Sequence, residues 1–143
     1  MYHKILVALD NTASDTALLA QSGKLAALLK SEVLLVHVAD GWAARNFEQF
    51  QLAESEEMKD DRRYLDGTAQ KLKTEHGLEV GTRLALGNPP DEILKVAHAE
   101  ACDLIAMASH GHKFLGDIWH GSTINRVRHN TKIPILIVRA EKI

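Results

Sequence analysis

The chain is poor in features that mark several specialised classes of protein. It has one cysteine, Cys102, among 143 residues, so no disulfide can form within the chain, and this is typical of a reducing compartment. Cys102 stands beside an apolar run, which favours a buried structural thiol over a nucleophile. The net charge is only -2 and no basic block occurs, so nothing supports strong binding of nucleic acid.

Long apolar runs and leader segments are also missing. No apolar run approaches the roughly 20 residues that cross a bilayer. The first residues run directly into a strand-like pattern, which leaves no room for a signal peptide. We therefore expect a soluble, cytoplasmic protein that makes no membrane contact. Its length predicts a single domain over residues 1–143.

The short motifs of several common active sites are missing as well. There is no GxxxxGK[ST] P-loop, no GxGxxG after the first predicted strand and no G-x-S-x-G elbow. His110 and His112 flank Gly111, but a metal site needs a third ligand at a suitable spacing, and none stands out. We interpret them as loop histidines near a ligand.

What the sequence does contain is an alternation of apolar runs and helical patterns. The runs cover residues 5–9, 33–38, 78–86, 103–107 and 135–138. Continuous apolar runs are typical of strands that are buried on both faces, as in a parallel sheet. Helical spacing predicts helices between them, the last over residues 124–129. The order predicts an α/β fold, a three-layer sandwich with a parallel sheet and helices on both faces.

Several local patterns give narrower expectations. Thr12 and Asp15 have the spacing of a capping box, and Gly77 is a plausible helix stop. Residues 87–92, in which two prolines are followed by two acids, predict a helix start. His37 interrupts the second apolar run and is interpreted as a core histidine bonded to backbone. The mixed charges of residues 56–63 predict a solvated helix face. Residues 42–50, with Trp42, Phe47 and Phe50, either cover a pocket mouth, form an interface or pack as a satellite cluster.

Polar and small residues follow the predicted strands. Because the carboxyl ends of parallel strands share one edge, where ligands bind in open α/β sheets, these residues are candidates for a site. They are Asp10, Val38, Gly87, Met107 and Ala108. Asp10 could bind magnesium through the phosphates of a nucleotide, or could simply form an Asx-turn.

The stretch from Ala108 to Thr123 indicates a phosphate site. It joins an apolar run to a helical pattern through glycines, and Ser122 and Thr123 add hydroxyl donors at the helix start. Helix starts attract anions, and glycine lets the backbone approach a phosphate. The alternative is an ordinary connection in which Ser122 caps its own helix.

Taken together, the pieces resemble a single-domain universal stress protein over nearly the full length. The matching segments are residues 4–10, 35–38, 87–89, 103–107, 109–111, 121–123 and 134–138. The resemblance implies a five-stranded parallel sheet of order 3-2-1-4-5. The ATP-binding branch of that family carries Gly, two residues, Gly, nine residues, then Gly-Ser or Gly-Thr. Gly111 and Gly121-Ser122 match this pattern, whereas Ala108 replaces the first glycine.

The resemblance also implies roles for these residues. Asp10 would lie near ribose and phosphates, Val38 would meet adenine through its backbone, and Met107 and Ala108 would line the nucleoside. The phosphates would be held by Gly111, Gly121, Ser122 and Thr123, with Gly87 and His112 nearby. The cofactor would be ATP, ADP or AMP, with magnesium at Asp10.

Three functions remain open at this point. The first is a regulatory module that binds ATP or AMP with slow or no hydrolysis. The second is a relative that has lost its nucleotide and acts as a dimeric interaction protein, which Ala108 favours because alanine adds a methyl group and resists positive φ. The third is a weak ATPase or autophosphorylating enzyme with Ser122 as acceptor. The family resemblance implies a homodimer through the last strand, Ile135, Leu136, Ile137 and Val138.

Overall fold

The structure is a computed structural model and describes residues 1–39, 54–109 and 118–140. Its elements alternate as the apolar runs predicted. The strands are β1 (Lys4–Leu9), β2 (Glu32–Ala39), β3 (Val80–Leu86), β4 (Leu104–Ser109) and β5 (Ile135–Arg139). The helices are α1 (Ser14–Leu29), α3 (Glu54–His76), α4 (Pro89–Ala99) and α5 (Ile118–His129).

The five strands form one parallel sheet in the order β3-β2-β1-β4-β5, which confirms the predicted α/β fold and strand order. β1 pairs with β2 along its whole length, from Lys4↔Glu32 to Leu9↔His37. Its pairing with β4 is shorter and ends at Val7↔Ala106. β1 is therefore the central strand, and it separates from β4 before either strand ends.

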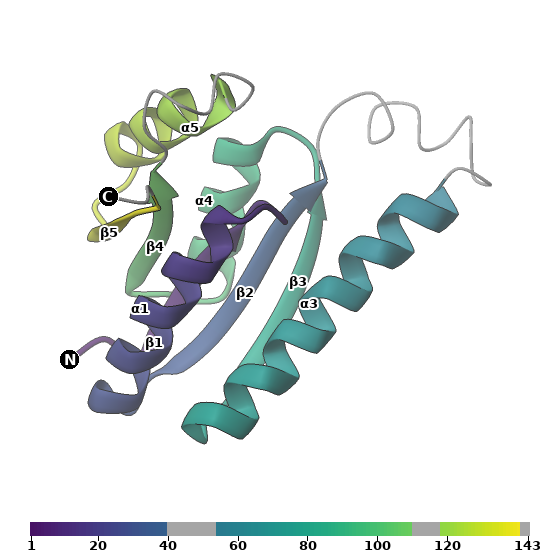
Figure 1. Ribbon diagram of the computed structural model, residues 1–143. Coiled ribbons are helices and arrows are strands. Elements are labelled where there is room, and N and C mark those ends of the chain that lie inside the picture. Colours follow the sequence, from purple (N-terminus) through teal and green to yellow (C-terminus); the bar gives the residue numbers. More distant parts are fainter. Residues whose placement is uncertain (40–53, 110–117, 141–143) are drawn as a thin grey trace.

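The sheet is covered on both faces (Figure 1). Ile5, Val7 and Leu35 point to the layer of α1 and α3, where they pack with Leu18 and Leu65. The alternate side chains of the same strands point to α4 and α5, in a cluster that contains Leu6, Val36, Ile105, Ile93 and Val127. Burial on both faces explains why these strands read as continuous apolar runs.

Two of the predicted helix boundaries are confirmed. α3 ends at His76, directly before Gly77, whose φ of +63° is the left-handed conformation that favours glycine and whose N–H donates to the Lys73 carbonyl. α4 begins at Pro89, directly after Asn88, where proline costs no helical hydrogen bond. Both ends follow from backbone chemistry that is visible in the sequence.

The start of α5 differs from the prediction. The helix begins at Ile118, six residues before Ile124, so Gly121, Ser122 and Thr123 lie inside it. Thr123, Ile124 and Val127 are buried on one side, and this packing extends the helix through residues that more often precede one.

Two predictions fall on parts of the chain outside the described residues. These are the role of Trp42, Phe47 and Phe50 and the phosphate contacts of Gly111 and His112. Within residues 1–39, 54–109 and 118–140, no helix combines the length and apolar character that crossing a bilayer requires. The same residues hold no group of three or more acidic, histidine or cysteine side chains arranged for a metal ion.

Candidate functional site

The predicted site residues meet at the carboxyl edge of the sheet. Asp10 follows β1, Val38 lies near the end of β2, and Gly87 follows β3. Met107 and Ala108 lie in the last half of β4. Since all five strands are parallel, these positions share one edge, as the sequence pattern predicted.

The gap between β1 and β4 marks the centre of this edge. After Val7↔Ala106 the two strands no longer pair, although β1 continues to Leu9 and β4 to Ser109. The chain winds outward to β2 on one side of this point and to β5 on the other. Such a switch point opens a crevice that binds ligands in doubly wound sheets.

Ala108 fits its position without the two costs expected of an alanine there. It lies in β4 and its φ is not positive. The residue is 4% exposed and belongs to the same apolar cluster as Leu9 and Val138. Alanine in place of glycine at position 108 therefore gives little support to a relative that has lost its nucleotide.

Met107 is buried on the other face of the sheet, in the cluster with Ile124 and Val127. With both side chains committed to the core, Met107 and Ala108 would reach a nucleoside mainly through backbone atoms. The sequence could not distinguish backbone from side-chain contact at these positions.

The first two turns of α5 present Gly121 and Ser122 to solvent, whereas Thr123 is 2% exposed and faces the core. A Cβ atom at Gly121 would meet no described atom within 4 Å. This open space is compatible with a ligand beside Gly121. Thr123, by contrast, belongs to the packed side of the helix.

Gly87 and Val38 lie where β2 and β3 end. The Gly87 N–H donates to the Ala39 carbonyl at 3.2 Å, and its φ of +139° is one that other residues rarely adopt. Val38 is half-buried and packs against the apolar cluster between the sheet and helices α4 and α5. Gly87 thus closes the edge beside Val38 with a tight turn.

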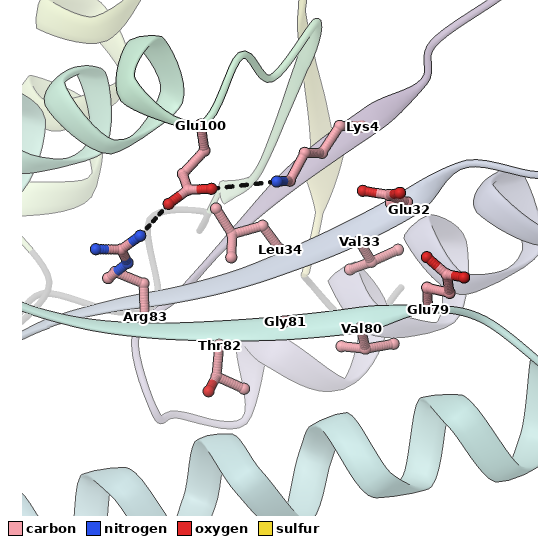
Figure 2. A pocket seen from close by; sticks show the side chains of 10 residues that line it. All are labelled: Lys4, Glu32, Val33, Leu34, Glu79, Val80, Gly81, Thr82, Arg83 and Glu100. Carbon is pink, nitrogen blue, oxygen red and sulfur yellow. Dashed lines mark hydrogen bonds and ion pairs between the residues drawn. The ribbon is translucent and has the colours of Figure 1, made fainter.

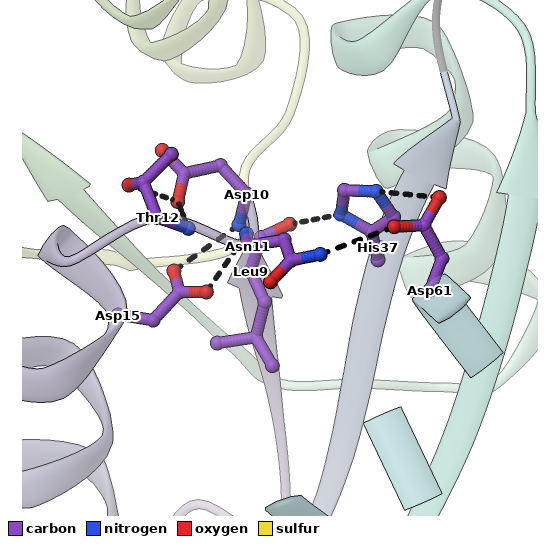
Figure 3. A network of polar contacts seen from close by, with 7 residues as sticks. All are labelled: Leu9, Asp10, Asn11, Thr12, Asp15, His37 and Asp61. Atoms are coloured by element: carbon purple, nitrogen blue, oxygen red, sulfur yellow. Dashed lines mark hydrogen bonds and ion pairs between the residues drawn. The ribbon is translucent and has the colours of Figure 1, made fainter. Parts of the chain in front are cut away.

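The loop after β1 is built around the Asp10 side chain (Figure 3). Its Oδ1 accepts the Thr12 N–H at 3.0 Å and the Thr12 hydroxyl at 2.6 Å, which forms the Asx-turn that the sequence allowed. Ser14 is the first residue of α1, and its hydroxyl also donates to the Asp10 carboxylate. These bonds fix the direction in which Asp10 leaves the sheet.

Asp15 completes the loop from inside α1. Its two oxygens accept the N–H groups of Asp10 at 3.1 Å and Asn11 at 2.9 Å. The predicted capping box with Thr12 is therefore wrong, because Asp15 reaches past Thr12 to amides nearer the strand. Tyr64 of α3 donates its hydroxyl to the same carboxylate at 2.6 Å.

Burial raises the pKa of Asp15 to about 6, although the hydrogen bond from Tyr64 acts in the opposite direction and the charge of Asp10 adds to the rise. Burial also raises the pKa of Tyr64, and its bond to Asp15 contributes because Tyr64 must remain protonated to donate. The pair is a buried, directional link between α1 and α3.

A second link joins the loop to α3 through Asp61. The side-chain amide of Asn11 donates to Asp61 Oδ1 at 3.2 Å, and His37 Nε2 lies 3.5 Å from Asp61 Oδ2 (Figure 3). His37 Nδ1 lies 2.9 Å from the Leu9 carbonyl, so this nitrogen carries a proton that it donates. The predicted core histidine bonded to backbone is confirmed.

Asp61 itself was missed, because it lies in the charge run of residues 56–63 that was predicted to be solvated. It is only 8% exposed. The available signal was its spacing: Asp61 lies three residues after Met58 and four before Leu65, on the face that α3 buries. One charged residue of the run therefore points into the molecule.

At the opposite, amino edge of the sheet lies a hollow of about 380 Å³ (Figure 2). Glu100 bridges Lys4 and Arg83 across it, with Lys4 Nζ 3.2 Å from one carboxylate oxygen. Its charges thus serve to tie β1, β3 and the end of α4 together. None of the predicted site residues lines it.

Comparisons with known proteins agree with this architecture. A model of the universal stress protein family matches residues 1–139. Universal stress protein MJ0577 of Methanocaldococcus jannaschii is 28% identical over 97% of this chain and 96% of its own. A solved structure of MJ0577 matches with a TM-score of 0.82, over 100% of this chain and 99% of that chain.

Two further solved structures contain a nucleotide. One is a universal stress protein from Archaeoglobus fulgidus in complex with dAMP, 20% identical, with a TM-score of 0.69 over 96% of this chain and 98% of that one. The other is a universal stress protein in complex with cAMP, 18% identical, with a TM-score of 0.69 over 98% of each chain. These two share the fold. Given the match over residues 1–139, the chain belongs to the universal stress protein family.

Proposed function

We propose that the protein binds an adenine nucleotide, ATP, ADP or AMP, at the carboxyl edge of its sheet and acts as a regulatory module. The observation that carries this proposal is the switch point of the sheet, where β1 and β4 cease to pair, with Asp10 directly after β1 and Ala108 near the end of β4. The complexes of related proteins with dAMP and cAMP support an adenine nucleotide as the class of ligand.

The residues present fit such a ligand in part. Asp10 would contact ribose and phosphates, and Val38, Met107 and Ala108 would contact the nucleoside through backbone. Gly121 and Ser122 are exposed on α5, and among the described residues no atom lies within 4 Å of a Cβ at Gly121, which is compatible with phosphate oxygens there. Thr123 would make no contact with the phosphates, because its side chain is buried and its N–H group lies beyond the first turn of α5. Gly87 shapes the edge.

Magnesium, when bound with the nucleotide, would offset phosphate charge. Asp10 is the residue that would hold it. The Asp10 carboxylate already accepts donors from Thr12 and Ser14, which keeps it oriented at the edge. Magnesium commonly uses few protein carboxylates together with phosphate oxygens, so one oriented Asp matches that chemistry.

Binding is favoured over turnover for a physical reason. Phosphoryl transfer needs a base or water-orienting group beside the reacting phosphate. Asp10 Oδ1 is engaged by loop donors, which suits a structural and binding role better than proton abstraction. A weak ATPase, or autophosphorylation at Ser122, is the alternative, and collapse of turnover in Asp10→Ala would support it.

The proposed partner is a second copy of this chain. β5 is an edge strand, and Ile137 on it is 44% exposed. An exposed apolar edge strand invites pairing with another strand, so residues 135–138 are the proposed interface.

Gly121→Val tests the nucleotide site directly. The valine side chain would fill the open space at Gly121 and block the phosphates, while valine costs less than glycine inside a helix, so the fold is kept. Isothermal titration calorimetry with ATP, ADP and AMP should show binding to the wild type and none to the variant. Gly67→Val, on the exposed face of α3, is the matched control, and unchanged affinity in Gly121→Val would refute the site.

A further inference from the structure

Two side chains of α3 reach the loop after β1 from roughly 50 positions away in the sequence. Tyr64 donates its hydroxyl to Asp15 at 2.6 Å, and Asp61 accepts the Asn11 amide at 3.2 Å. Neither belongs to the carboxyl-edge residues that a nucleotide would touch. Asp61 nevertheless contacts the loop that carries Asp10, and Tyr64 contacts Asp15 at the start of α1, which holds that loop.

The first contact acts through Asp15. Asp15 is buried and holds the N–H groups of both Asp10 and Asn11, so its orientation sets the path of the backbone as it leaves β1. The Tyr64 hydroxyl fixes that orientation from the side of α3. Without it, one oxygen of a buried carboxylate loses a short, charge-assisted hydrogen bond.

The second contact acts through Asn11. The φ of Asn11 is +61°, a left-handed conformation that asparagine adopts more readily than other residues with a Cβ. Its side chain is held by Asp61, which also faces His37 on β2 (Figure 3). The side chain of Asp61 therefore holds the loop in this left-handed turn from the side of α3.

We propose that Tyr64 and Asp61 are positioning residues for the nucleotide site, which hold the loop after β1 in the one shape that presents Asp10 to the ligand. The inference rests on the proposed function. It adds α3 to the site as a regulatory element: any event that displaces α3 releases the loop and weakens binding. By linkage, nucleotide binding must tighten the contact of α3 with the loop by the same factor.

The test uses Tyr64→Phe and Asp61→Asn in the full chain, with Mg·ATP and AMP as probes. Each variant should bind about fivefold or more weakly than the wild type, at a temperature where circular dichroism shows both fully folded. Tyr2→Phe, which removes a hydroxyl at the far edge, and Asp66→Asn, on the exposed face of α3, should bind as the wild type does.

Two further readouts separate positioning from a general structural effect. Hydrogen exchange should speed up at the amides of Asp10 and Asn11 in Tyr64→Phe, while the amides of β4 and β5 stay unchanged. In an Asp10→Ala background, Tyr64→Phe should weaken binding no further, because the residue acts through the loop that carries Asp10.

The outcomes are distinguishable. If the wild type binds neither probe, the proposed function fails and this inference fails with it. If the wild type binds but both α3 variants bind equally well, the nucleotide site stands and the positioning role is overturned. Additive losses with Asp10→Ala would likewise overturn it.

Discussion

Asp15 is a buried carboxylate whose protonation state is coupled to the loop it holds. Burial raises its pKa from 3.8 to about 6, so the folded protein binds this proton more tightly than the unfolded chain does. Its contribution to stability is therefore complete below about pH 4 and is lost as the pH rises through about 6.

Asp15→Asn should remove this dependence. The difference in unfolding free energy between wild type and variant should fall by about 1–3 kcal/mol as the pH rises from 4 to 7, since one pKa unit corresponds to about 1.4 kcal/mol. Urea titrations at several pH values measure it. A difference that stays constant with pH would contradict the assignment.

Asp103 supplies a control of opposite sign. Burial raises its pKa, but this is outweighed by the backbone N–H groups of Lys4 and His3, which hold the pKa of Asp103 below its ordinary value. Its contribution to stability is therefore lost as the pH falls, so Asp103→Asn should change the profile in the acid limb in the reverse direction.

Ser22 and Ser14 are both buried serines of α1, but they differ in the hydrogen bonding of their hydroxyl groups. Its hydroxyl is buried in α1 and has no hydrogen-bond partner among the residues that the structure describes. Ser22→Ala should raise the unfolding free energy by about 1 kcal/mol, because it removes an unsatisfied group and improves helix propensity. Ser14→Ala, which breaks bonds to Asp10 and Thr12, should lower it in the same urea titration. A loss of stability in Ser22→Ala would indicate a partner for the hydroxyl.

At the scale of elements, α1 and α3 come close together at one glycine. A Cβ on Gly23 would lie 2.9 Å from His76 Nε2 and 3.3 Å from Leu72 Cδ2. Gly67, on the exposed side of α3, has no described atom within 4 Å of such a Cβ. Only the first glycine is therefore needed for helix packing.

Alanine at these two positions should have different effects. Gly67→Ala should raise the unfolding free energy by about 1 kcal/mol through helix propensity alone. Gly23→Ala gains the same propensity but must displace His76, so its net gain should be smaller or negative. Thermal unfolding measured side by side would reveal this, and equal gains in both variants would show that the His76 side chain moves aside at no cost.

The elements were predictable where local chemistry and packing agree. Apolar runs located all five strands, and Gly77 and Pro89 located two helix ends. The start of α5 was not, because Gly121 and Ser122 resemble residues outside a helix, while burial of Thr123 and Ile124 extends the helix through them. Packing against the sheet decided this boundary, and packing is not visible in a short window of sequence.

The candidate site likewise has a part that could be predicted from the sequence and a part that could not. The positions of Asp10 and Ala108 at one edge follow from topology alone, which the alternation of elements determined. The contributions of Tyr64 and Asp61 depend on how α3 crosses the loop, a contact between residues about 50 apart. The charged residues around Asp61 predicted an exposed helix face, and that prediction did not single out Asp61 as buried.

For the whole molecule, the edge strand β5 makes the proposed assembly testable. Ile137→Lys would place like charges near each other across a symmetric pair of β5 strands, so the dimer should dissociate. Leu28→Lys, at a residue 79% exposed on α1, is the matched control and should leave assembly unchanged. Analytical ultracentrifugation measures both, and a monomeric wild type would refute the interface.

The amino edge of the sheet, remote from Asp10, is anchored by two sets of contacts. Glu100 forms ion pairs with Lys4 and Arg83, and the Asp103 carboxylate accepts the N–H groups of His3 and Lys4. None of these anchoring residues is among those proposed to contact the nucleotide. Loops at the other end can therefore be diversified, by evolution or in a designed library, without altering the anchor. Residues of the anchor are the ones that such a library should leave fixed.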